Sequence, residues 1–461
     1  MTTKTGDSPT SSTVSGYPVA PPAEEEGKKG AEARLVGLLT MIFALSFIDR
    51  GALNLIVQPI IQDLHITDLQ MSYLLGLSFA ILYSVLSIPA GHLADLFSRR
   101  LIIGVAAFFW SCMAALCGFA NSYWQLFVGR MGLGVGEAGL PPAAYSLLRD
   151  GVAPQRRAFA LSVYNVGPLF GNGLGALIGG SLYAAASHGA FAGVPVVNTL
   201  KPWQIVIVIP GLIGMPLSLL LLLVKEPPRP PVAAKGEPAS FSDMFAYVGQ
   251  HWRLYAPLFG IIIFGSMGLG WNTWLPAALS RVWGLSPSVL GKVMGPLAMV
   301  ITPVTFVAIG RLMDHFSRDG RTDRVLRISI IAILVNLPPT LGILLAPTVP
   351  TMWTMYVLSL IFTSGLQIAG GVVLTTVTPP RLIGKVSAFF FLAGNLLGLA
   401  TGPTVYALVS QHFFRGSAAL AHAMLVCYPA LMGIVLILTW ITAGQVRHWA
   451  GRQSDNARPI E

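Results

Sequence analysis

The stretch Gly91-His92-Leu93-Ala94-Asp95-Leu96-Phe97-Ser98-Arg99 recurs 219 residues later as Gly310-Arg311-Leu312-Met313-Asp314-His315-Phe316-Ser317-Arg318, and six of the nine positions are identical. Each copy follows a long apolar run. Further matches, such as Gly76 with Gly295, keep nearly the same offset. The repeat therefore indicates a duplicated chain. Two equivalent halves of a membrane protein are expected to form a binding site between them, near the midplane of the membrane.

The composition excludes an ordinary soluble domain. Of the 461 residues, 54% are hydrophobic and 10% are charged, whereas a soluble domain carries about 25% charged residues. The surface of a chain this apolar is expected to contact the lipid of a membrane. The three cysteines lie in apolar runs without metal-ligand spacing, so we expect no metal site and no cofactor.

Apolar segments divide the chain into two halves. Twelve segments have a composition suited to membrane-spanning helices, and they predict an all-α membrane protein of two six-helix bundles. The expected spans are 35–60, 69–93, 101–120, 123–148, 157–185, 203–224, 254–281, 286–313, 325–347, 351–376, 382–410 and 418–446. The expected domains are a disordered tail (1–34), the first bundle (35–225), a linker with a short interfacial helix (226–252), the second bundle (253–447) and a second tail (448–461).

The basic residues predict the orientation. If both tails face the cytoplasm, 23 of the 29 lysines and arginines fall on cytoplasmic segments, a strong positive-inside bias. We therefore expect both termini in the cytoplasm and a multi-pass protein of the cell (inner) membrane. The formal net charge of +10 is then a sign of topology, and the expected partners are membrane lipids and not nucleic acid.

Four charged residues lie deep inside the first bundle. Asp49 and Arg50 are about 22 Å from the start of segment one, at 1.5 Å per residue, and segment four carries Arg130 and Glu137 on one helix face. Charges at such depth normally face a cavity or each other. We expect Asp49 to pair with Arg130, and Glu137 with Arg50. The alternatives are a static salt-bridge cluster and a protonatable switch formed by Asp49, Arg130 and Glu137, with protons as the coupling ion.

The second half does not repeat these charges. Its candidate cavity residues are neutral or aromatic: Trp271, Asn272, Trp274, Gln367 and Asn395. An ionic wall opposite an aromatic wall suits an amphipathic substrate, whose charged head Arg50 would bind. The alternative is that the second wall simply packs against the first.

The doubled phrase is expected to form a gate on the cytoplasmic side. Gly91 and Gly310 permit a close approach or a tight turn. Asp95 and Asp314 are placed to bond a neighbouring helix start or to pair with Arg99 and Arg318. Arg100 completes the first copy, whereas Asp319 follows the second. The alternative is that these residues are only topology determinants and loop caps.

Both copies of the phrase resemble the loop signature of the major facilitator superfamily. Phe47-Ile48-Asp49-Arg50, together with Gly129-Arg130-Met131-Gly132-Leu133-Gly134-Val135-Gly136-Glu137-Ala138, is similar to the spinster lineage within it. Related anion:cation symporters also carry an Asp-Arg pair in helix one. The resemblance implies a proton-linked or facilitative transporter, and animal spinster proteins move sphingosine phosphates and lysophospholipids.

The predicted function is proton-linked transport of an amphipathic or lipid-like anion by alternating access, in a monomer. Two alternatives remain. One is a transporter of small organic anions such as sugar acids, held by Arg50 and Arg130. The other is an uncoupled lipid scramblase. An enzyme is not expected, because the sequence contains no nucleophile or metal set.

Overall fold

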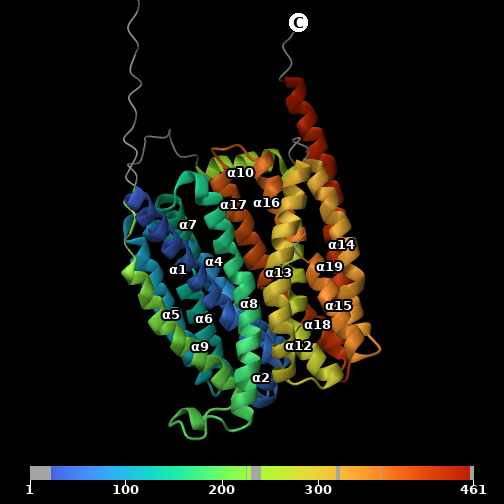
Figure 1. The fold of residues 1–461 in the computed structure, drawn as a ribbon. Coiled ribbons are helices and arrows are strands. Elements are labelled where there is room, and N and C mark those ends of the chain that lie inside the picture. The colour runs from blue at the N-terminus through green and yellow to red at the C-terminus, as the bar shows by residue number, and fades with distance from the viewer. Residues whose placement is uncertain (1–21, 225, 230–239, 318–321, 364, 457–461) are drawn as a thin grey trace, which may run out of the picture.

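The computed structural model describes residues 22–224, 226–229, 240–317, 322–363 and 365–456, and the regular structure in these ranges is entirely helical (Figure 1). Ten helices or helix series there are long and apolar enough to cross a membrane. Two further crossings are broken helices, one formed by α6 and α7 and the other by α15 and α16. The predicted all-α, twelve-crossing membrane fold is confirmed.

The first bundle contains nine α-helices, and three of its six crossings are built from more than one of them. The helices are α1 (Pro22–Leu55), α2 (Val57–Leu64), α3 (Asp68–Ser72), α4 (Ser78–Leu96), α5 (Arg99–Gly118), α6 (Tyr123–Glu137), α7 (Leu140–Gly151), α8 (Arg157–Ser187) and α9 (Pro202–Leu219). A π-helical turn, Tyr73–Leu77, joins α3 to α4.

The second bundle follows a short helix, α10 (Phe241–Gln250), in the stretch where the sequence predicts an interfacial helix. Its helices are α11 (Trp252–Gly268), α12 (Gly270–Trp283), α13 (Pro287–Ser317), α14 (Thr322–Leu345), α15 (Val349–Phe362), α16 (Gly365–Val377), α17 (Ile383–Ala393), α18 (Gly402–Phe413) and α19 (Ala419–Asn456). A second π-helical turn, Gly394–Leu399, lies between α17 and α18. The π turns therefore fall in crossings two and eleven.

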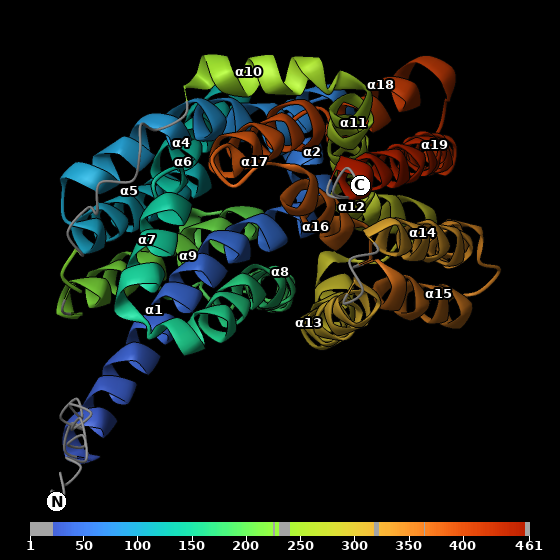
Figure 2. The ribbon, with the colours of Figure 1, turned by 90° about the horizontal axis from the view of Figure 1, so that it is seen from above.

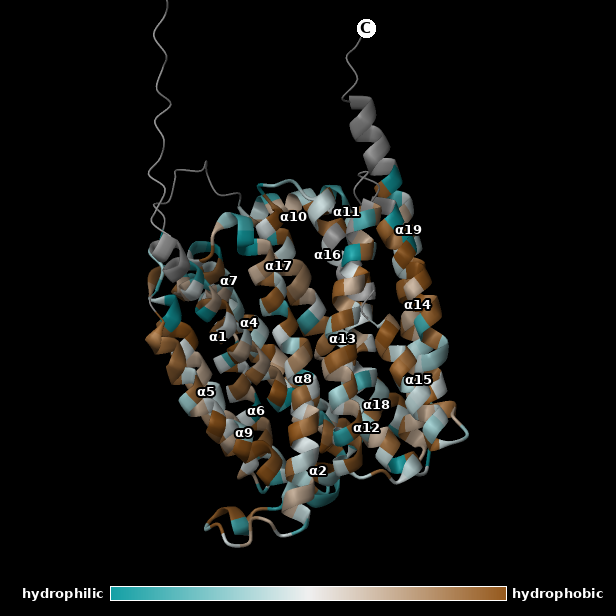
Figure 3. Ribbon diagram, viewed as in Figure 1, coloured by the Kyte–Doolittle hydropathy of each residue, from teal (hydrophilic) through white to brown (hydrophobic). Residues whose placement is uncertain are grey.

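The two bundles stand side by side, as the view along the helices shows (Figure 2). The start of α1, the end of α19 and α10 all lie on one side of the molecule (Figure 1). We call this the terminal side, and the opposite side the far side. Hydrophobic residues run along the helices (Figure 3). Large apolar side chains such as Ile88, Val105 and Trp440 are 59–71% exposed, as expected for surfaces that contact lipid.

The first and last helices extend beyond the predicted bundles. Helix α1 begins at Pro22 and α19 continues to Asn456, so residues 22–34 and 448–456 are helical where the sequence indicates tails. The extension Ala-Glu-Glu-Glu-Gly-Lys-Lys-Gly-Ala-Glu-Ala is rich in strong helix formers. Such residues continue a helix that the membrane segment has already nucleated.

The break between α6 and α7 positions Glu137 at a helix end. Pro141 and Pro142 occupy the first turn of α7, where a missing N–H group is tolerated. Within α6, a Cβ at Gly134 would lie 2.5 Å from the Phe79 carbonyl oxygen, and one at Gly136 would lie 2.7 Å from Trp110 Cβ. The glycines of this segment therefore allow α6 to pack tightly against α4 and α5.

Glycines also bring the two bundles together. A Cβ at Gly180 of α8 would lie 2.8 Å from the Gly291 Cα of α13, and one at Gly295 would lie 2.8 Å from the Gly173 carbonyl oxygen. Gly180 and Gly291 lie near the far-side ends of their helices. The bundles are thus in backbone contact toward the far side.

Candidate functional site

Arg50 of α1 forms an ion pair with Glu137 of α6, as the sequence predicts. The Arg50 side chain is 21% exposed and that of Glu137 only 4%. The Arg50 guanidinium also lies over two rings, 4.5 Å from the centre of Phe47 and 4.2 Å from that of Phe79. Because the Nε–H of Arg50 is buried and has no hydrogen-bond partner in the described structure, this guanidinium keeps an unused donor.

Asp49 and Arg130 do not form the predicted ion pair in this conformation. Both line a small cavity of about 10 Å³ together with Cys117. Arg130 is buried, and its Nε donates to the Leu74 carbonyl oxygen at 3.3 Å. The cavity is close to the smallest that accommodates one water molecule. The two groups are therefore neighbours that line one small cavity, whose other walls are mostly apolar, and their role as a switch stays a prediction.

The tryptophans of the predicted aromatic wall are buried within the second bundle. Trp274 is fully buried, and its indole N–H donates to the Pro403 carbonyl oxygen at 2.9 Å. Trp271 is 3% exposed and packs against Tyr428, with ring centres 5.1 Å apart. Of the four predicted residues whose side chains are described, only Asn272 is exposed, and Asn395 is half-buried in the π-helical turn. The side chain of Gln367 lies outside the described residues.

Arg99 is buried, and it does not pair with Asp95. Its guanidinium contacts Asp150 of α7, Glu226 at 3.1 Å and the Pro227 carbonyl oxygen at 2.9 Å. Asp95 is exposed, so the predicted pairing of these two residues is wrong for this conformation. The reason is geometric: Arg99 begins α5 and contacts α7 and the chain after α9, whereas Asp95 is an exposed residue in the last turn of α4.

The carboxylates around Arg99 are held in their charged form. Burial acts to raise the pKa of Asp150, but hydrogen bonds from Arg149 and Arg99 lower it below its ordinary value of 3.8. Burial likewise acts to raise the pKa of Glu226, and hydrogen bonds from Ser98 and Arg99 lower it below 4.5. Opposite charges and N–H donors stabilise a carboxylate more than this degree of burial destabilises it.

The remaining predicted gate residues are less constrained. Gly91 and Gly310 lie within helices α4 and α13. A Cβ at Gly91 would come no closer than 3.8 Å to Pro142, and one at Gly310 would meet nothing within 4 Å. Neither glycine forms the expected turn or close approach. Arg100 donates to the Val224 carbonyl oxygen at 2.8 Å. The Asp314 side chain and Arg318 lie outside the described residues.

Comparison with known proteins gives the family. The model of the Major Facilitator Superfamily matches residues 39–403. The chain belongs to the major facilitator superfamily. Since this superfamily consists of transporters and not enzymes, the sequence-based prediction of a transporter is confirmed.

Relatives within the superfamily extend over nearly the whole chain. An MFS-type efflux pump of Mycolicibacterium smegmatis is 27% identical, covering 92% of this chain and 95% of its own length. Protein spinster homolog 1 of Xenopus tropicalis is 26% identical over 89% of this chain and 83% of its own. A probable galactarate/D-glucarate transporter, GarP, of Escherichia coli K12 is 24% identical over 89% and 97%.

A solved structure shares the fold of this superfamily member. A bacterial homolog of the human lysosomal transporter Spinster, in an inward-facing and unoccupied conformation, superposes with a TM-score of 0.77. It is 24% identical and covers 92% of this chain and 98% of its own. The predicted resemblance to spinster proteins is confirmed at the level of family and fold.

The structure of this superfamily member also contains a polar contact that sequence reasoning missed. Arg281, at the far-side end of α12, forms a bidentate ion pair with Asp68 at the start of α3 and donates to Gln58 of α2. It therefore joins the two bundles. The sequence shows Asp68 and Arg281 only as isolated charges at segment ends; the signal that could have paired them is their opposite sign on the same predicted side.

Proposed function

We propose that this superfamily member is a proton-linked secondary transporter of an amphipathic, lipid-like anion of the sphingolipid or lysolipid type, working by alternating access. The observation that carries the proposal is the environment of Arg50. Its guanidinium lies over two aromatic rings, neutralises Glu137 and keeps a buried unused donor. An anionic head group offers the oxygen that this donor lacks, and the rings favour an apolar stem beside it.

The charges explain how a proton could be coupled to the anion. Asp49, Glu137, Arg50 and Arg130 sum to zero when all are ionised. Protonation of Asp49 would leave one net positive charge in the cluster, which an anionic head group compensates. Because Asp49 and Arg130 face one small cavity without an ion pair, Asp49 is free to change its protonation state without first breaking a direct contact.

We assign the terminal side to the cytoplasm of a bacterial inner membrane. Arg99, Arg100, Arg156 and Arg157 gather on that side, in agreement with the positive-inside rule. With the far side closed by Arg281 and Asp68, the substrate reaches Arg50 from the cytoplasmic side in this conformation. The protein acts as a monomer in this proposal.

Binding of a lysophospholipid tests the substrate class. Lysophosphatidic acid and glucarate are titrated against the purified protein in one calorimetric assay. We expect the lysophospholipid to bind, Arg50→Ala to lose that binding, and Lys292→Ala, a charge removal on an exposed far-side residue, to retain it. Unchanged binding by Arg50→Ala would disprove the head-group role.

Proton coupling is tested separately from binding. Spin-label distances between the two bundles are measured between pH 5 and 8. We expect Asp49→Asn to abolish the pH dependence, whereas Asp63→Asn, which removes a carboxylate held by Lys201 and Trp203 within the first bundle, leaves it intact. A pH dependence that survives Asp49→Asn would show that Asp49 is not the switch. The absence of any pH dependence in wild type would favour an uncoupled carrier or scramblase.

The second candidate is a transporter of small organic anions, which the similarity to GarP favours. A small dicarboxylate would need both Arg50 and Arg130 as clamps. Arg130 is only 6% exposed and already donates to a backbone carbonyl, so one of the two clamps is out of reach here. Glucarate binding that is lost in both Arg50→Ala and Arg130→Ala would favour this candidate.

A further inference from the structure

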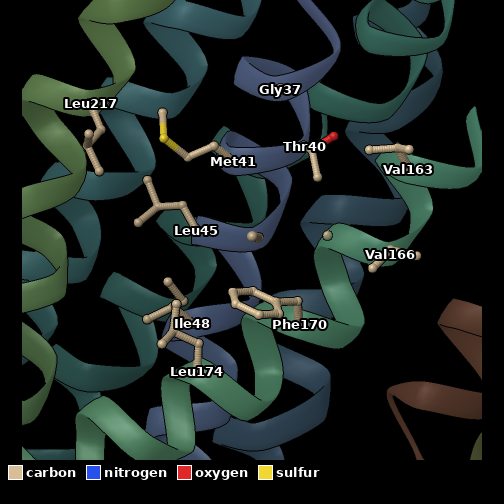
Figure 4. A pocket seen from close by; sticks show the side chains of 12 residues that line it. Gly37, Thr40, Met41, Leu45, Ile48, Val163, Val166, Phe170, Leu174 and Leu217 are labelled. Carbon is tan, nitrogen blue, oxygen red and sulfur yellow. The ribbon is translucent and has the colours of Figure 1, made fainter. Parts of the chain in front are cut away.

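A larger cavity, of about 450 Å³, lies in the terminal-side half of the first bundle. Helices α8 and α9 diverge there, and α1 forms its floor (Figure 4). Met41, Leu45 and Ile48 line it from α1, Phe170 from α8 and Leu217 from α9. We call this cavity the α1–α8–α9 groove.

The groove lies on the opposite face of α1 from Arg50. Ile48 and Arg50 are two residues apart, which is about 200° around a helix. On α8, the lining residue Phe170 and Asn172 are likewise two residues apart and point to opposite faces. Asn172 lies beside Gly51, the neighbour of Arg50. Since Phe170 is 41% exposed, the groove opens on the outer surface of the bundle, which faces lipid. It is therefore separate from the proposed transport site.

The lining suits a hydrocarbon chain and little else. The only hydroxyl among the twelve lining residues is that of Thr40, and it already donates to the Val36 carbonyl oxygen at 2.7 Å. A polar ligand would thus lose its hydrogen bonds to water without replacement. The volume is about three times that of an apolar cavity that binds benzene, which gives room for a flexible chain.

Basic residues stand at the terminal-side mouth of the groove. Arg34 precedes the lining residue Gly37 by three positions on α1, so it lies on the same helix face as the groove. Arg156 ends the 3-10 turn directly before α8. Arg156 pairs with Glu32 at 3.0 Å. Arg34 is exposed, and its only described hydrogen bond joins Nε to the Gly30 carbonyl oxygen. These three described side chains, Arg34, Arg156 and Glu32, together carry one net positive charge.

We propose that the α1–α8–α9 groove binds one acyl chain of an anionic phospholipid from the adjoining leaflet, with the lipid phosphate held by Arg34. An anionic lipid satisfies both halves of this surface, because its chain fills the apolar groove and its phosphate meets the guanidinium. The bound chain fills the space between α8 and α9 and supports α8, the helix that packs against α13 of the second bundle.

A side chain placed in the mouth tests the groove. A Cβ at Gly37 would meet nothing within 4 Å, so Gly37→Trp can enter the groove without disturbing the fold. Gly433→Trp on α19 is the matched control, because Gly433 has the same free space. Delipidated protein is titrated with dioleoyl phosphatidylglycerol, and bound lipid is counted by native mass spectrometry.

We expect wild type and Gly433→Trp to bind one phosphatidylglycerol tightly, and Gly37→Trp to bind it at least about tenfold more weakly, because the substituted ring occupies the space of several methylene groups. Arg50→Ala should bind it as wild type does, which separates this lipid from the proposed substrate. Equal binding by Gly37→Trp and wild type overturns the proposal.

Arg34→Gln tests the head group. In wild type we expect phosphatidylglycerol to bind more tightly than phosphatidylcholine with the same chains. Arg34→Gln should reduce this ratio of affinities about fivefold, which corresponds to about 1 kcal/mol per basic residue near an anionic lipid. Val166→Trp, at a second lining position, should repeat the effect of Gly37→Trp. A preference that is unchanged in Arg34→Gln contradicts the assignment of the phosphate.

Discussion

Arg281 Nη1 and Nη2 donate to the two carboxylate oxygens of Asp68 at 2.7 and 2.6 Å, and Arg281 Nε donates to Gln58 at 2.7 Å. All three guanidinium nitrogens of Arg281, a residue of the second bundle, thus donate to side chains of the first bundle. The contact lies at the far-side end of the interface, beyond the glycine contacts of α8 and α13. Opening of the far side must break it, so this relationship sets part of the conformational balance.

Asp68→Asn should favour conformations that are open on the far side. Hydrogen bonds to charged groups are worth about 1.5–3 kcal/mol, and the pair is only 16–18% exposed, so we expect the open-to-closed ratio to rise at least about tenfold. Spin labels on the far-side ends of α3 and α12 measure the distribution. Lys201→Gln is the control, since Lys201 pairs with Asp63 inside one bundle on the same side. Equal distributions for Asp68→Asn and wild type would contradict a latching role.

Gly180→Val should act on the same balance through packing. A Cβ at Gly180 would lie 2.8 Å from Gly291 Cα and 3.0 Å from the Pro287 carbonyl oxygen, so α8 and α13 have to separate. Overpacking of this kind costs about 1–3 kcal/mol. We expect a larger far-side spin-label distance and a lower melting temperature. Gly444→Val, where a Cβ meets nothing within 4 Å, should change neither; a closed far side in Gly180→Val would refute the prediction.

Arg99→Gln should destabilise the first bundle. The Arg99 and Asp150 side chains are 1% and 3% exposed, and removal of one partner leaves a buried charge without its main counter-ion. Breaking a buried pair costs about 3–5 kcal/mol, and we expect the lower end because Arg149 still contacts Asp150. Thermal unfolding in detergent measures the loss. Arg100→Gln removes only contacts to backbone carbonyls and should cost less. A greater loss in Arg100→Gln would contradict the role of Arg99 as the centre of this cluster.

The stability that the Arg99 cluster provides should depend on pH only in acid. Because the pKa values of Asp150 and Glu226 are lowered from 3.8 and 4.5 in the folded protein, their contribution is complete above about pH 5 and is lost as pH falls through the lowered values. The difference in melting temperature between wild type and Arg99→Gln should be constant from pH 8 to 5 and shrink below pH 4.5. A difference that changes between pH 6 and 8 would show that other groups titrate in this cluster.

The charged cluster shows how far sequence reasoning reached into the candidate site. The depth of Asp49, Arg50, Arg130 and Glu137 is a matter of counting residues along a helix, and the pairing of Arg50 with Glu137 followed from opposite charge at similar depth. The separation of Asp49 from Arg130 did not follow, because it depends on the rotation of α1 and on the Leu74 carbonyl that Arg130 bonds. The inward direction of Trp274 likewise depends on Pro403, 129 positions away.

The amino-acid sequence is sufficient to predict the number of crossings, the duplication and the embedded charges. Each of these depends on local hydropathy or on self-similarity, since the backbone of a membrane segment has to bond within that segment. Only the folded arrangement of the helices shows the partners of Arg99, the contact of Arg281 with Asp68 and the groove beside α1. These depend on how helices rotate and approach one another, and that is set by packing between residues far apart in the chain.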